Sequence, residues 1–217
     1  MSVQSLAGPF AIAGFALLAL SSGSIVTRDP RQNVSLYRLA SIPQAAIAVM
    51  LAILYGHIEL YFLAAAILAL KGVVAPRLLV VPWPERQHSH YALTGQLGTP
   101  AALAVIVGVL MFSYRVSVAL APPPLQTAMA ATMASGLVGL LAPAVRYELA
   151  AQAAGLLHGE AGITAGALLL VGHLPVAPDV ISLAELLFLA LLLGVLLARV
   201  VRVHGRADAS LLTVLRG

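Results

Sequence analysis

Long apolar stretches of the sequence enclose three ionisable side chains: Lys71, Glu160 and Glu185. A charge at the centre of a membrane helix costs about 2.5–3.5 kcal/mol on insertion scales, so such residues usually face protein, water or one another. Burial disfavours the charged form of carboxyls and amines alike, which brings both groups closer to proton exchange. We therefore interpret the three residues as a candidate proton relay with Glu160 at its centre.

Hydroxyl side chains lie at helical spacing from both acids. Thr164 follows Glu160 by four residues, and Ser182 precedes Glu185 by three, so each hydroxyl shares the helical face of its acid and could hold water there. His158 is two residues from Glu160 and points to a different face. Thr164 and Ser182 are candidate accessory residues, whereas for His158 packing is the preferred role and an accessory role the alternative.

Two local patterns bear on how the charged residues are positioned. Ala151, Gly155 and Gly159 repeat every four residues beside Glu160, a small-residue stripe that lets a neighbouring helix approach closely. Pro76 follows Lys71 by five residues, and its ring should clash with the carbonyl of Gly72. The helix is expected to loosen just after the lysine, and a simple kink is the alternative.

A static role is the main alternative for the charges themselves. Lys71 could form a buried ion pair, for instance with Glu160, that holds helices together and moves nothing. Buried ion pairs can often be replaced by well-packed apolar residues.

The composition assigns the chain to the integral membrane proteins. Hydrophobic residues make up 61% of its 217 residues and charged residues 9%, and the mean hydropathy is +1.00, whereas soluble domains carry about 25% charged residues. In lipid, helices satisfy their backbone groups internally, so we predict an all-α bundle. The chain has no cysteine, which excludes thiolate metal sites and disulfides within it.

Apolar windows and their polar interruptions predict seven membrane helices. Their approximate ranges are 5–26, 36–55, 58–81, 98–119, 125–142, 147–172 and 179–201. Ten arginines then fall in alternate connections or at the C-terminal end: Arg28, Arg31, Arg38, Arg77, Arg86, Arg146, Arg199, Arg202, Arg206 and Arg216. Because basic residues collect on the cytoplasmic side, this predicts an external N-terminus and a cytoplasmic C-terminus.

The chain resembles component E of hydrogenase-4, a membrane component of formate hydrogenlyase-type complexes related to respiratory complex I. The resemblance rests on Lys71 in ILALKGVVAPRLL, Glu160 in LLHGEAG, Glu185 in ISLAELLFL and the tail HGRADASLLTVLRG. It implies one transmembrane domain over 1–217, with a four-helix part at 1–121, a three-helix part similar to the small K subunit of complex I at 122–203, and a cytoplasmic tail at 204–217. Glu160 and Glu185 would match the two buried glutamates of that K subunit.

Two positions depart from the family pattern. Ala161 and Gly162 stand where the family commonly has Asn-Gly, and Glu185 stands where an aspartate is frequent. Both departures keep the acid and change its hydrogen-bonding surroundings.

The resemblance also implies a location in the inner membrane of a bacterium or archaeon, and it implies partners. They are antiporter-like membrane subunits, a membrane anchor similar to the H subunit of complex I, and hydrogenase-like large and small subunits. The nickel–iron site and the iron–sulfur clusters would belong to these partners, so the chain itself is expected to be non-catalytic and free of cofactor, metal and nucleic acid. The rival hypotheses are a component of a multisubunit sodium/proton antiporter and a non-conducting structural spacer.

The predicted orientation can be tested with a reporter protein fused to the C-terminus. A reporter that works only in the cytoplasm should be active, because the C-terminal arginines hold this end inside. Activity only of a reporter that requires export would contradict the predicted orientation.

Overall fold

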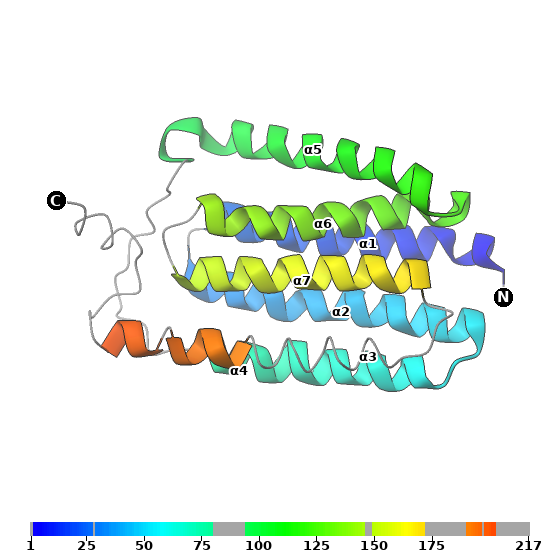
Figure 1. Ribbon diagram of the computed structural model, residues 1–217, viewed down its shortest axis with the longest axis horizontal. Coiled ribbons are helices and arrows are strands. Elements are labelled where there is room, and N and C mark those ends of the chain that lie inside the picture. Colours follow the sequence, from blue (N-terminus) through cyan, green and yellow to red (C-terminus); the bar gives the residue numbers. More distant parts are fainter. Residues whose placement is uncertain are drawn as a thin grey trace.

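The structure is a computed structural model that describes residues 2–27, 29–79, 94–145, 149–171, 190–196 and 198–202, and within these ranges it is helical and has no strand (Figure 1). Its elements in chain order are α1 (Val3–Val26), α2 (Pro30–Tyr55), α3 (Glu59–Ala69), the π-helical segment η1 (Leu70–Val74), α4 (Ala75–Leu79), α5 (Thr94–Leu120), the 3₁₀ turn η2 (Pro123–Leu125), α6 (Gln126–Val145) and α7 (Leu149–Val171). Residues 190–196 and 198–202 are also helical.

Six helical stretches within the described residues are long and apolar enough to cross a membrane. They are Val3–Val26, Arg31–Tyr55, Glu59–Leu79, Ala101–Leu120, Pro123–Leu141 and Ala151–Leu170. The chain is therefore a multi-pass helical membrane protein, and the prediction of a helical membrane bundle is confirmed. The predicted helix at 179–201 lies partly outside the described residues, so the count of seven and the orientation stay predictions.

Local sequence explains where α2 begins and ends. The Asp29 carboxylate accepts a hydrogen bond from the backbone N–H of Arg31 at 2.8 Å, and Pro30 occupies the first turn, both of which favour a helix start. The helix therefore begins at Pro30, earlier than the predicted start at 36, because Asp29 and Pro30 start the helix and are not part of a loop. Gly56, with φ 72°, ends the helix in the left-handed conformation.

The helices run side by side, with α5 along one edge of the bundle and α3 with α4 along the opposite edge (Figure 1). Helices α1, α2, α6 and α7 lie between these edges and contact one another. In the apolar window of the α5 span 11% of the residues are buried, whereas in that of the α7 span 67% are buried. Helix α7 is thus a central element, and α5 offers most of its apolar surface to lipid or to another protein.

Glycines let α6 and α7 touch backbone to backbone. A Cβ atom at Gly139 would lie 2.7 Å from the Cα of Gly159, and one at Gly162 would lie 2.6 Å from the Cα of Gly136. Real Cβ atoms do not approach this closely, so larger side chains would force the helices apart. The expectation that Gly159 belongs to a seam of close helix approach is confirmed.

Replacement of Gly139 by Ala should destabilise the bundle by about 1–3 kcal/mol, because the added methyl group meets α7 backbone that cannot move aside. Thermal unfolding in detergent would measure the effect. Gly108→Ala in α5 is the matched control, since a Cβ there meets nothing within 4 Å and alanine favours the helix. Equal stability of the two variants would contradict the seam.

Candidate functional site

Lys71 and Glu160 form an ion pair between η1 and α7. The ammonium Nζ of Lys71 lies 2.7 Å from Oε2 and 2.9 Å from Oε1 of Glu160, so it donates to both carboxylate oxygens. Both residues lie near the middle of their spans, Glu59–Leu79 and Ala151–Leu170. The structure thus brings together two of the three ionisable residues of the predicted relay. The same contact is also the one expected if the charges form a static ion pair.

Lys71 lies in a π-helical turn and is buried in the bundle. Pro76 has no N–H to donate to the carbonyl of Gly72, and the backbone N–H of Ala75 instead bonds to the carbonyl of Leu70, five residues back. The turn therefore holds one residue more than an α-helical turn. The expectation that the helix loosens beside the lysine is confirmed, and the distortion is a π turn rather than a simple kink.

Lys71 continues the buried face of α3. This face runs through Leu60, Leu63, Ala64 and Ile67, and Lys71 follows at helical spacing. Gly72, the next residue of η1, is buried as well. A Cβ atom at Gly72 would lie 3.0 Å from Oγ of Ser41 on α2, so glycine permits the close approach of the two helices here.

Glu160 accepts a third hydrogen bond and is partly exposed. The hydroxyl of Thr164 donates to Oε1 of Glu160 at 2.7 Å, which confirms that the two side chains share a face. The side chain of Glu160 is 22% exposed, whereas that of Lys71 is 1% exposed. The pair is therefore buried at Lys71 and partly accessible at Glu160.

His158 lies in a separate polar junction where four helices meet. Its ring is fully buried, contacts Tyr37 of α2 edge-on with ring centroids 5.6 Å apart, and lies 3.4 Å from Oγ of Ser21 on α1 through Nδ1. Ser21 in turn shares a 2.7 Å hydrogen bond with Ser135 of α6. His158 thus has a packing role, and no hydrogen bond joins it to Glu160 within the described part of the chain.

Helix α2 contributes a polar stripe that was not recognised in the sequence. Asn33, Tyr37 and Gln44 lie on one face of α2, and all three are fully buried. Their amide and hydroxyl groups, like Nε2 of His158, have no hydrogen-bond partner among the described residues. The spacing of these residues, four and then seven, could have indicated a polar helix face. They do not stand out as buried charges do because they are uncharged, and Asn33 lies in a segment predicted to be a loop.

Two predicted site residues have no described structure. Glu185 and Ser182 lie outside the described residues, so the third member of the predicted relay and its accessory hydroxyl stay predictions.

The geometry of the Lys71–Glu160 pair permits direct proton exchange. Proton transfer between side chains requires heavy atoms within about 2.6–3.2 Å, and both contacts of the pair meet this requirement. The site includes no group of three or more metal-ligating side chains within the described residues. The arrangement can therefore hold and pass a proton between an amine and a carboxylate at mid-membrane depth.

Comparisons with known proteins give one relative. The chain is 30% identical over 203 residues to "Uncharacterized protein Rv0085" of Mycobacterium tuberculosis, and the match covers 92% of both chains. No protein-family model matches the sequence, and no solved structure matches it.

The coupling of the pair can be measured with a double-mutant cycle of Lys71→Met and Glu160→Gln. Each single variant leaves one buried group without its partner and should be destabilised, whereas the double variant should recover much of the loss. We expect a coupling energy of about 1–3 kcal/mol in thermal or denaturant unfolding, since one edge of Glu160 is exposed. Additive effects would contradict an energetically significant pair.

Proposed function

The chain belongs to the same family as the mycobacterial protein Rv0085, and we propose that it is a proton-conducting membrane component of a hydrogenase-4-like redox complex. The observation that carries the proposal is the Lys71–Glu160 pair, a salt bridge at the middle of two membrane spans. Ionisable residues at this depth are expensive, and most mark ion or proton pathways.

The pair has the features of a relay step. When Glu160 takes up a proton it loses its attraction for the ammonium of Lys71, and when it releases the proton the salt bridge re-forms. Thr164 donates a hydrogen bond to the same carboxylate and so helps to hold it beside Lys71. The π turn around Lys71 supports the idea of a movable lysine, because π turns occur frequently at functional sites.

The exposed edge of Glu160 supports an onward carrier. Ile163 and Ala167 are exposed on the same face of α7, so this face is available to another helix. A carboxylate in contact with lipid alone would be costly, and we propose that Glu185, or a charged residue of an antiporter-like partner, receives the proton here. The buried polar stripe of α2 supplies further groups inside the bundle that can bind water.

The remaining features of the proposal come from the sequence. We propose seven spans with an external N-terminus and a cytoplasmic C-terminus in the cytoplasmic membrane, and a three-helix part at 122–203 that corresponds to the K subunit of complex I. The partners would be antiporter-like subunits, an anchor similar to the H subunit of complex I, and hydrogenase-like proteins that carry the nickel–iron site and the iron–sulfur clusters.

The static spacer is the second candidate, and the direct contact of Lys71 with Glu160 is the observation that favours it. A spacer needs the pair for assembly alone. The double variant Lys71→Met with Glu160→Gln separates the two functions, because it removes both charges together and leaves no unpaired charge.

If the pair is a relay, membranes that contain the assembled complex with this double variant should retain electron transfer. Proton translocation should fall by about 100-fold or more, the lower end of what a positioned proton-transfer group contributes. Acidification of inverted vesicles would be measured against electron transfer. Glu59→Gln is the matched control, since Glu59 is exposed at the start of α3. Normal translocation by the double variant would remove the relay and leave the spacer.

Purification of the tagged chain from its native membranes tests the partners. Copurification of antiporter-like subunits with iron and nickel would support the hydrogenase-4-like complex. Antiporter-like subunits without metal would favour a multisubunit cation/proton antiporter instead.

A further inference from the structure

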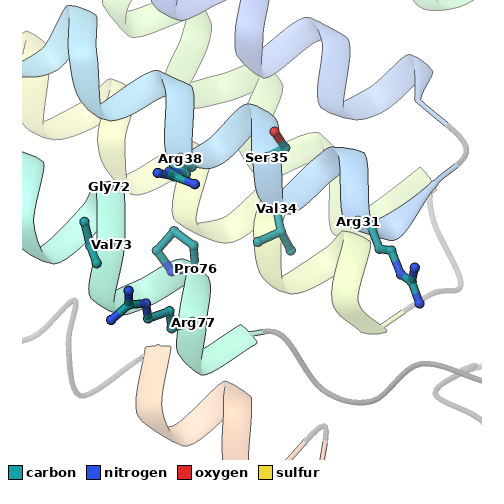
Figure 2. A pocket seen from close by; sticks show the side chains of 8 residues that line it. All are labelled: Arg31, Val34, Ser35, Arg38, Gly72, Val73, Pro76 and Arg77. Atoms are coloured by element: carbon teal, nitrogen blue, oxygen red, sulfur yellow. The ribbon is translucent and has the colours of Figure 1, made fainter.

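An open cavity of about 270 Å³ lies between the first turns of α2 and the end of the Glu59–Leu79 span (Figure 2). Its lining consists of Arg31, Val34, Ser35, Arg38, Gly72, Val73, Pro76 and Arg77. Three of these eight residues are arginines and none is acidic, so the cavity has a strongly positive wall.

The three guanidinium groups form no ion pair with any described residue. The salt bridge in the described part of the chain is that of Lys71 with Glu160, and the Asp29 carboxylate accepts from the backbone N–H of Arg31. Figure 2 shows Arg38 and Arg77 on the two sides of Val73 and Pro76, with Arg31 at the far side of Val34. Like charges around one cavity repel, and a bound anion would relieve this repulsion.

The depth of Arg38 adds a second argument. Arg31 is the first residue of the Arg31–Tyr55 span, and Arg38 lies seven residues further along, about 10 Å at the rise of an α-helix. The side chain of Arg38 is nevertheless exposed. An exposed guanidinium at this depth is costly unless an anion or water reaches it.

We propose that this cavity binds a phosphate group, with Arg38 and Arg77 as its principal ligands and Arg31 and Ser35 at its rim. Guanidinium groups bind phosphate through paired N–H donors, and basic pockets between membrane helices hold anionic headgroups. The phosphate belongs either to an anionic phospholipid or to free inorganic phosphate. Val34, Val73 and Pro76 give the cavity an apolar side that suits the glycerol and first methylenes of a lipid.

The site also touches the turn that carries Lys71. Gly72 and Val73 belong to η1, so a phosphate bound here rests against the π turn and favours the conformation that directs Lys71 to Glu160. This inference stands apart from the proposed relay, because phosphate binding requires no proton movement.

The test uses the purified full-length chain in detergent and native mass spectrometry with defined probes. Phosphatidylglycerol, phosphatidylcholine and inorganic phosphate are titrated separately, and phosphate is also used as a competitor. If the site binds lipid, phosphatidylglycerol should bind more tightly than phosphatidylcholine, and inorganic phosphate should not displace it. For a free-phosphate site, phosphate should bind alone and displace the lipid.

Substitutions locate the site. Arg38→Gln and Arg77→Gln should each weaken binding by about tenfold or more, since a hydrogen bond to a charged group contributes about 1.5–3 kcal/mol. Arg115→Gln is the matched control, an exposed arginine within the α5 span and outside the cavity. Arg77 lies near a span end, so its variant tests the site even where Arg38→Gln does not fold.

Arg38→Lys should bind less tightly than the unaltered chain and more tightly than Arg38→Gln, because it keeps the charge and loses the paired donors. Failure of all three probes to bind would overturn the proposal. Equal losses in the Arg115, Arg38 and Arg77 variants would overturn it as well.

Discussion

Burial of Lys71 at mid-membrane depth is the constraint on which the rest of the bundle depends. Its ammonium needs a negative partner within reach, and Glu160 provides both carboxylate oxygens. This contact in turn requires η1 and α7 to stay close together, with α7 fixed by its neighbours. Helix α7 is fixed at the glycine seam, where Gly159 and Gly162 let the α6 backbone approach it. The glycines of the seam and the buried ion pair thus both fix the position of α7 in the bundle.

Much of this arrangement could be predicted from single residues. The apolar windows predicted the helices, because lipid leaves a chain few other ways to satisfy its backbone. Pro76 predicted the loosened turn, and Thr164 was expected on the face of Glu160, since both follow from local geometry. These features depend on residues at most five positions apart, and sequence spacing describes them well.

Other features depend on long-range packing and could not be predicted in the same way. The sequence offered Lys71 and Glu160 as charges but did not show that they touch, because 89 residues separate them. The junction of Ser21, Tyr37, Ser135 and His158 joins four helices, and no local pattern links these positions. The start of α2 was missed for another reason: Asp29 and Pro30 were assigned to a connection, although both are helix-start signals.

The π turn has a further consequence, for insertions and deletions in this family. A π turn accommodates one extra residue without breaking the helix, so the Ala75 to Leu70 hydrogen bond marks the place where chain length and helix rotation are matched. Loss of one residue from Leu70–Val74 would rewind this segment as a regular α-helix, and the residues beyond it, Arg77 among them, would keep their orientation. Loss of one residue from the regular helix α3 would instead rotate everything beyond it by about 100°. The π turn is therefore the place in this span where a change of one residue in length disturbs the bundle least.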